Sequence, residues 1–272
     1  AVFLAADNPA YEAASAEVMA ALRSLDGVVV EVWGWDEACV GVTTSDPEAF
    51  ARHLQDTVHR ATRLWCAVGI GETKLQAKTA TGFAKPGGVA RLTRPTWLPT
   101  MGDRPVTAIP GIGARTAQRL GALGIVTVAD LARSDHEELA RHFGPMIGPN
   151  LRVLGLGGHD TPVSAEPRAP RGRSREVTFE RDLTDPTEVA DQLAALAREV
   201  TASVSPLGRP VTHVAVKVRT ATFFTRTRSG KLATPTFDPE VVAAKAREVL
   251  ARFETGRPIR LLGVRVVLDE RS

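Results

Sequence analysis

Asp36 and Glu37 are adjacent carboxylates whose type and position suit metal-assisted chemistry on phosphates. Apolar runs at residues 28–33 and 38–42 flank a break at Gly34, which predicts a β-hairpin with the two acids at its tip. Neighbours on a flat strand point to opposite faces, so both side chains can serve one site only at a turn or bulge. Mg²⁺ prefers carboxylate oxygens and completes its shell with water and substrate phosphates. Taken alone, such a pair is better explained as a solvated turn.

Three lysines follow the hairpin in sequence. Lys74 and Lys78 lie one helical turn apart in a helix predicted for about residues 73–83, so they share a face. Lys85 lies just past the end of that helix, where a flexible cation can contact a triphosphate and neutralise developing charge. The alternative is three ordinary surface lysines, and the lysines alone do not decide between the two.

A second candidate site begins with the two glycines of Pro-Gly-Ile-Gly. Gly111 and Gly113 allow a tight turn and a close backbone approach around Ile112, as in a helix-hairpin-helix. The next helix is predicted to start at about Ala114, so its free N–H groups and positive dipole end, beside Arg115, suit a phosphate. Such contacts position DNA without reading its sequence. The alternative is an ordinary helix–helix turn with a glycine cap.

Basic residues gather in the last third of the chain. Residues 1–100 carry 9 Lys+Arg against 11 Asp+Glu, whereas residues 163–272 carry 19 against 14. No acidic residue occurs within residues 200–237. A one-signed stretch favours a polyanion, although a solvated basic face without a partner has the same composition. The candidate DNA contacts here are Arg173, Arg175, Lys217, Arg219, Arg226, Arg228 and Lys231.

Composition is that of a globular protein with a core, at 43% hydrophobic and 24% charged residues. No apolar run is long enough to span a membrane and no signal peptide opens the chain, so we expect a cytoplasmic protein without membrane contact. Cys39 and Cys66 lack the CxxC spacing of zinc and redox sites. We expect two buried, reduced thiols.

The pattern of elements divides into two halves. In the first, helices are predicted from Asn8, from Asp46-Pro47 to about Arg63, and over residues 73–83, with a buried strand at residues 64–70. Together with the hairpin they predict an α+β layer with helices on one face of a mixed sheet. Residues 95–107 are predicted as a connection, followed by short helices with glycine turns. The second half predicts β–α–β–β–α–β, a ferredoxin-like order, over residues 176–180, 186–204, 211–219, 222–228, 239–252 and 259–268.

These motifs occur in an order that resembles the Y family of translesion DNA polymerases, of the bacterial DNA polymerase IV type. Gly34-Trp35-Asp36-Glu37-Ala38 is similar to the family's Ser-Ile-Asp-Glu-Ala motif. The resemblance covers almost the whole chain and is specific as an ordered set. The other matching stretches are residues 11–19, 68–87 with Ala-Lys-Pro at its end, 109–131, 178–179, 216–219 and 260–264.

The resemblance implies an α+β, multidomain fold. It implies the C-terminal part of a palm (residues 1–99), an all-α helix-hairpin-helix thumb (100–162), a linker (163–173) and a little finger (174–272). In the family a first palm strand bearing Asp-x-Asp and then the fingers precede the palm, and Ala1 follows both. We therefore expect this chain alone to be inactive.

By resemblance, the function is lesion-bypass DNA synthesis by two-metal nucleotidyl transfer from a dNTP to the primer 3′-hydroxyl. Asp36 and Glu37 would be catalytic and ligate Mg²⁺, two ions in all with the third carboxylate outside this chain, and Lys85 would bind the nucleotide. Primer–template DNA would be held by its backbone. We expect a monomer and leave binding of a sliding clamp open, because residues 268–272 contain no Gln-plus-apolar peptide.

The chain differs from the family motifs at three positions. The motif's Ser and Ile are Gly34 and Trp35, and its Asn is Thr73, whereas both carboxylates are intact. The bulk of Trp35 implies a differently shaped base-pair site. The alternative function is a catalytically inactive accessory member that binds DNA and partners. A helix-hairpin-helix nuclease or glycosylase lacks its own catalytic signature here.

Overall fold

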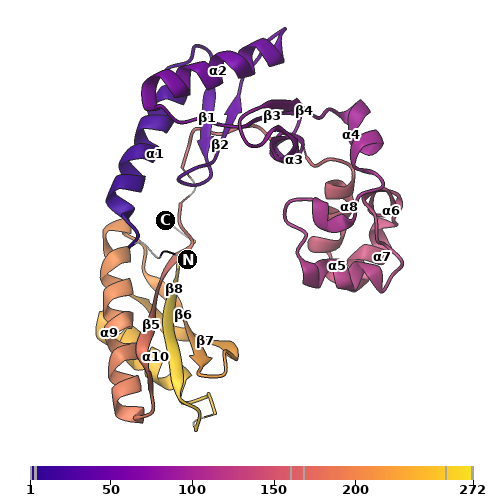
Figure 1. Cartoon of the computed structure of the whole chain (residues 1–272). Coiled ribbons are helices and arrows are strands. Elements are labelled where there is room, and N and C mark those ends of the chain that lie inside the picture. Colours follow the sequence, from indigo (N-terminus) through magenta and orange to yellow (C-terminus); the bar gives the residue numbers. More distant parts are fainter. Residues whose placement is uncertain (1, 3–4, 160, 168, 255, 271–272) are drawn as a thin grey trace. The chain divides into compact units, whose positions relative to one another are not determined.

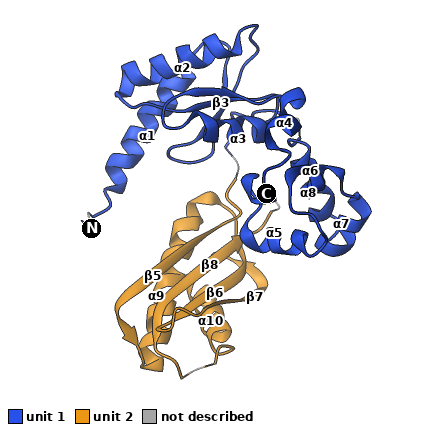
Figure 2. Cartoon of the chain, turned by 45° about the vertical axis from the view of Figure 1, so that its right-hand side comes forward, with its two compact units in different colours: residues 1–167 blue, residues 168–272 orange. Residues whose placement is uncertain are grey.

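The computed structural model describes residues 2, 5–159, 161–167, 169–254 and 256–270. They form two compact units, residues 1–167 and 168–272, shown in separate colours in Figure 2. The division falls within the predicted linker 163–173, but strand β5 already begins at Gly172, so the last two linker residues are strand. Within the described ranges, no helix is both long enough and apolar enough to cross a membrane.

The first unit opens with two helices and the predicted hairpin. Asp7, rather than Asn8, caps the first helix by accepting from the N–H of Ala10 at 3.2 Å. Asp46 caps the second helix as predicted, accepting from Ala49 N–H at 2.9 Å. The two helices contact each other and share a core with the hairpin through residues such as Met19. The elements, labelled in Figure 1, are α1 (Asn8–Arg23), β1 (Val29–Val32), β2 (Ala38–Gly41) and α2 (Pro47–Thr62).

A second small sheet follows, with a helix between its strands. Strand β3 (Val68–Ile70) pairs in parallel with β4 (Val89–Arg91), and helix α3 (Lys74–Ala84) connects them. The predicted strand over residues 64–70 was therefore too long, because Trp65 is 63% exposed and its ring stacks on His59 at 4.0 Å. The hairpin is antiparallel and this pair is parallel, so both pairings of the predicted mixed sheet occur, in two separate sheets.

Short helices make up the rest of the first unit. The connection predicted over residues 95–107 is wrong in part, because a helix begins at Arg94 behind a capping box of Thr93 and Thr96. Trp97 is fully buried, and its indole N–H donates to the carbonyl of Gly155 at 2.8 Å. The elements are α4 (Arg94–Met101), the 3₁₀ turn η1 (Val106–Ala108), α5 (Ala114–Gly121), α6 (Val128–Arg133), α7 (His136–Phe143) and α8 (Ile147–Gly155).

The second unit has the predicted β–α–β–β–α–β element order. Its four strands are antiparallel in the spatial order β5-β8-β6-β7, so each β–α–β unit is split by a strand of the other. Asp185 and Asp238 cap its two helices. The elements are β5 (Gly172–Leu183), α9 (Pro186–Val204), the 3₁₀ turn η2 (Ser205–Leu207), β6 (Val211–Thr220), β7 (Thr225–Thr236), α10 (Pro239–Leu250) and β8 (Ile259–Leu268).

Helices α9 and α10 cover one face of this sheet, as Figure 2 shows. Buried valines on the central strands, such as Val214 and Val216, pack against them. Side chains alternate along a strand, so the residues between these valines lie on the other face. Among the described residues of this unit, no helix covers that face.

Candidate active site and nucleic-acid interface

The β1–β2 hairpin places both predicted carboxylates at its tip. The N–H groups of Trp33 and Gly34 donate to the carbonyl of Glu37 at 2.9 and 3.1 Å, which closes the turn. Gly34 has no atom closer than 3.9 Å to where a Cβ would lie, so this position also has room for the family's serine. The prediction of a hairpin with exposed Asp36 and Glu37 at its tip is confirmed.

The two carboxylates have different surroundings. Glu37 forms an ion pair with Lys78 of α3, which ties the tip to that helix. Asp36 has neither a hydrogen bond nor an ion pair with any other described residue, although its side chain is exposed. Asp36 is therefore the freer of the two to bind a ligand, and Glu37 is the better fixed.

One cavity of the first unit brings the predicted chemical groups together. It has a volume of about 960 Å³ and is lined by Asp36 and Glu37 from the hairpin. Lys85, just past the end of α3, also lines it, and no ion pair among the described residues involves Lys85. Two acids and one unpaired cation lining the same cavity suit a ligand that carries a metal ion and phosphates. The remaining charged lining residues are Glu72, Lys74, Lys78 and Arg91.

Glu31 is a polar residue of this site that the sequence did not reveal. It lies in β1 with only 8% of its surface exposed. Its carboxylate accepts from the Trp33 indole and the Ser164 N–H, both at 3.1 Å, and pairs with Lys74. Burial raises the pKa of this carboxyl, but the donated hydrogen bonds outweigh burial and lower the pKa to about 2. Glu31 thus joins the hairpin, α3 and the segment around Ser164.

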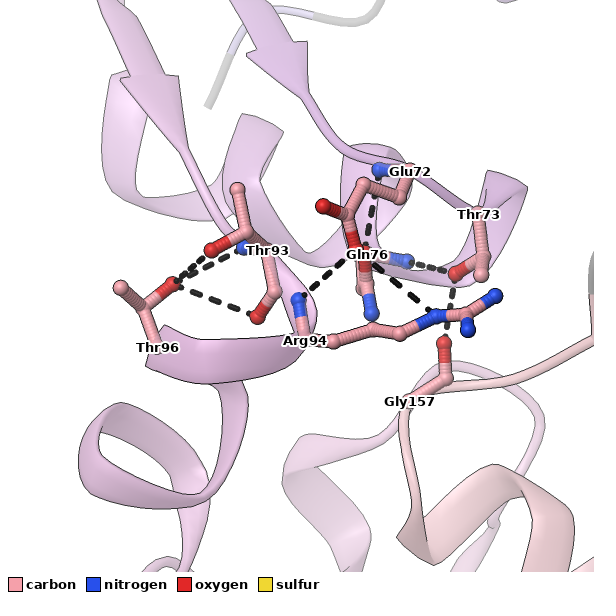
Figure 3. Close-up of polar contacts among 7 residues, drawn as sticks. All are labelled: Glu72, Thr73, Gln76, Thr93, Arg94, Thr96 and Gly157. Atoms are coloured by element: carbon pink, nitrogen blue, oxygen red, sulfur yellow. Dashed lines mark hydrogen bonds and ion pairs between the residues drawn. The ribbon is translucent and has the colours of Figure 1, made fainter.

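The start of α3 is fixed by polar contacts shown in Figure 3. Thr73 accepts from Gln76 N–H at 3.1 Å and donates to the carbonyl of Gly157 at 2.5 Å, so it caps the helix and binds the segment just after α8. Glu72 accepts from the N–H of Arg94 at 3.1 Å, at the start of α4. Gly157 has φ +95°, a backbone conformation that side chains disfavour, so glycine is preferred there. Thr73, which replaces the asparagine of the family motif, therefore still caps helix α3.

The helix-hairpin-helix has the predicted glycine geometry. Gly111 has φ +96°, which a side chain disfavours, and Gly113 precedes α5 without a side chain to cap it. The exposed first turn of α5, with Arg115 on it, faces solvent and suits a phosphate. Ile112 corrects the prediction: it is 4% exposed and its N–H donates to Ile109, so neither its side chain nor its N–H is available to DNA.

The predicted basic patch is divided between the two faces of the second sheet. Directly opposed residues in an antiparallel pair share a face, and Arg226 and Arg228 oppose the buried Val218 and Val216. They therefore lie on the helix-covered face, at the edge strand β7. The same register places the predicted contacts Arg173 and Arg175, opposite Val266 and Val264, on that face too.

The open face carries the remaining predicted cations. Lys217, Arg219 and Lys231 oppose Thr227, Thr225 and His213 there. Lys217 is already paired with Glu176 at 2.6 Å, which offsets part of its charge. Arg265 is exposed on the central strand β8, opposite Ala215, and also lies on this face. It was not among the DNA contacts predicted from the sequence. Arg265 lies between Val264 and Val266 in β8, and this alternation of apolar and charged residues could have identified it as a residue of the open face.

The hairpin residues fit a hard divalent cation in part. Asp36 and Glu37 supply carboxylate oxygens to one cavity, and water and phosphate oxygens usually complete a Mg²⁺ shell. Among the described residues, no group of three or more His, Cys, Asp or Glu could hold a metal ion. A site for two ions therefore takes at least one further oxygen ligand beyond this pair.

Comparison with known proteins gives matches along most of the chain. A model described as the impB/mucB/samB family matches residues 1–82, and the C-terminal domain model of that family matches residues 170–267. A SAM-like helix-hairpin-helix tandem model matches residues 103–144, as the glycine turn predicted.

Relatives that match along nearly the whole chain carry the name DNA polymerase IV. DNA polymerase IV 2 of Mycobacterium tuberculosis is 48% identical over 271 residues, covering 98% of this chain and 78% of the relative. DNA polymerase IV of Methanoculleus marisnigri is 36% identical over 273 residues, covering 99% and 75%. A solved Y-family DNA polymerase chimera shares the fold, with a TM-score of 0.79, 23% identity and coverage of 96% of this chain and 76% of that one.

Proposed function

The chain belongs to the DNA polymerase IV family, within the Y family of DNA polymerases, and we propose that it copies damaged templates by two-metal nucleotidyl transfer. As a member of this family it is a DNA-directed DNA polymerase. The single observation that carries the finer proposal is the cavity that Asp36, Glu37 and Lys85 share. Bound Mg²⁺ would stabilise the developing charge on the transferred phosphate and lower the pKa of the primer 3′-hydroxyl.

The residues of the cavity have separable roles in this proposal. Asp36, unpaired among the described residues, would hold the metal, and Glu37, held by Lys78, would assist beside it. Lys85 would bind the triphosphate of the incoming dNTP, because it lines the same cavity and has no ion-pair partner among the described residues. The third carboxylate would come from the family's first palm strand.

DNA would be held by two surfaces that contact its backbone. The exposed N–H groups after Gly113, with Arg115, suit one phosphate. On the second unit the open sheet face offers Arg219, Lys231 and Arg265 to further phosphates. Contacts to phosphates carry no sequence information, so binding through these two surfaces would be independent of sequence. Clamp binding, a monomeric state and cytoplasmic location stay predictions.

Primer extension by the intact protein tests the catalytic assignment. The double variant Asp36→Ala plus Glu37→Ala should lose extension while keeping primer–template affinity, because the tip lies on an exposed turn. The matched control, Glu12→Ala plus Glu17→Ala, removes the same charge from exposed positions of α1. Equal extension by wild type and the hairpin variant would sink the assignment and favour the accessory, non-catalytic alternative.

A further inference from the structure

The turn between β6 and β7 exposes two aromatic rings side by side in sequence. Phe223 is 66% exposed and Phe224 is 52% exposed. An arginine lies over each ring: the guanidinium carbon of Arg260 is 5.2 Å from the centroid of Phe223, and that of Arg226 is 5.5 Å from the centroid of Phe224. Two exposed phenylalanines at a loop tip lose the hydrophobic gain of burial, so a partner surface is the natural explanation.

The backbone holds these rings in a fixed and strained turn. Phe223 donates its N–H to the carbonyl of Thr220 at 2.9 Å, and Thr220 donates to that of Phe224 at 3.0 Å. A third bond, from Ala221 N–H to the carbonyl of Pro258 at 2.9 Å, joins the turn to the start of β8. Phe223 has φ +61°, in the left-handed region that a bulky residue disfavours. Strain of this kind persists where surrounding contacts impose it, and it clusters at functional sites.

The charges around the tip favour a polyanion as the partner. Arg219, Arg226 and Arg260 all lie at the tip, the first donating to Thr225 Oγ1 at 2.9 Å. The carboxylate oxygen Oδ1 of Asp182 lies 3.8 Å from Nη1 of Arg260. Residues 200–237, which include the tip, contain no acidic residue. Exposed rings beside arginines are the combination that binds single-stranded nucleic acid, since bases stack on the rings and phosphates pair with the cations.

We propose that the Phe223–Phe224 tip stacks on unpaired bases of DNA. The inference rests on the proposed DNA binding by the second unit and adds a contact to bases where the duplex ends. Each ring has one face toward its arginine and most of its surface in solvent, which leaves room for a base. A protein partner is less favoured, because two rings alone make a small apolar patch and an arginine lies over each of them.

Fluorescence anisotropy with three DNA probes tests the proposal on the full chain. The probes are a blunt duplex, the same duplex with a single-stranded overhang, and that duplex with an overhang of abasic residues. Wild type should bind the probe with the normal overhang more tightly than the other two probes. In the double variant Phe223→Leu plus Phe224→Leu, this ratio of affinities should be about tenfold smaller. Affinity for the blunt and abasic probes should not change, because leucine retains apolar bulk and no charge is altered.

Two further variants make the result unambiguous. Phe237→Leu changes a phenylalanine of similar exposure, 48%, just beyond the opposite end of β7, and should bind all three probes as wild type does. Phe223→Tyr plus Phe224→Tyr retains both rings and should retain the preference. Equal preference in wild type and the leucine variant would overturn the proposal, and so would a wild-type preference that persists with the abasic overhang. Blunt-duplex binding reports the proposed function separately, because it depends on the open sheet face.

Discussion

Two β-hairpin tips in this chain have opposite chemistry. The β1–β2 tip carries Asp36 and Glu37, and an ion pair to Lys78 ties it to a helix of the same unit. The β6–β7 tip carries Phe223 and Phe224 with arginines over their rings. One tip therefore offers negative charge to a cavity, and the other offers aromatic surface and positive charge to solvent. Under the two proposals, the same local structure would serve catalysis in the first unit and binding in the second.

The contrast extends to how each tip is held. The acidic tip is closed by two N–H groups that share the Glu37 carbonyl, and its position also depends on buried Glu31 in the adjacent strand. The aromatic tip has a positive φ at Phe223 and a bond to the neighbouring strand through Pro258. Changes at the first tip should thus alter rate with little effect on affinity, and changes at the second should do the reverse.

The largest effect is expected from Asp36→Asn. This change retains the size of the side chain but removes the charge that would hold a metal ion, so several kcal/mol of transition-state stabilisation should be lost. Primer extension at saturating DNA should fall by about a thousandfold, whereas DNA affinity should stay within about twofold of wild type.

The comparison of tips supplies the control. The leucine double variant at Phe223 and Phe224 should extend primers at the wild-type rate once DNA is saturating. If that variant instead lost as much rate as Asp36→Asn, the division between a catalytic tip and a binding tip would be wrong.

Glu31→Gln should give the next largest effect, on stability. Trp33 and Ser164 donate to different oxygens of Glu31, so the single oxygen of the amide can accept from only one of them, and Lys74 would keep a largely buried charge without its carboxylate. Unfolding of the first unit, followed by urea denaturation, should become easier by about 3 kcal/mol. Glu48→Gln, which breaks an exposed pair with Arg91, should cost less than about 1 kcal/mol.

The same residue makes a pH prediction with a definite sign. The folded-state pKa of Glu31 is lowered from 4.5 to about 2, so its stabilisation is present above pH 4.5 and is lost as the pH falls toward 2. Wild type should therefore lose more stability than Glu31→Gln over that interval. Asp130, whose pKa is also lowered to about 2 by hydrogen bonds from Thr127, is common to both proteins and cancels in the difference. Parallel stability curves would contradict the role given to Glu31.

Sequence pattern alone predicted the elements whose ends carry strong signals. Helix α9 begins after Asp185 at Pro186 and β8 spans an apolar run, and both have the predicted bounds. Strand β4 has three residues, too few to show a period, and it was missed. Helix α4 was predicted as a connection because it contains Pro95 and Pro99, although a capping box at Thr93 permits a helix start there.

The candidate site was predictable where one segment contains it. Adjacent Asp36 and Glu37 at a break between apolar runs needed only local pattern. The buried role of Glu31 depends on Ser164, which lies 133 positions later in the chain, so no local signal reveals it. The faces on which the basic residues lie also depend on how the strands pair. The register places Arg228 opposite Val216 of the neighbouring strand, and the sequence of β7 alone does not show this.

That division predicts an intermediate effect on DNA affinity. Replacing Arg219 and Arg265 with alanine removes two cations from the open face, whereas replacing Arg173 and Arg175 removes two from the helix-covered face. The first variant should bind duplex DNA about tenfold or more weakly, with the slope of log affinity against log salt reduced by about 2. The second should bind nearly as wild type does. Equal losses in both variants would mean that net charge, rather than the open face, holds DNA.

The smallest effect tests the strain at the aromatic tip. Phe223→Gly and Phe223→Ala both remove the ring, but only glycine adopts φ +61° without steric cost. The glycine variant should be more stable than the alanine variant by about 1 kcal/mol in denaturation of the second unit, after its greater unfolded-state entropy is offset. At Thr222, next in the turn and without a positive φ, the order should reverse and alanine should be the more stable. If the alanine variant were the more stable one at both positions, Phe223 would be unstrained. The rings would then be placed by their arginines rather than by the turn.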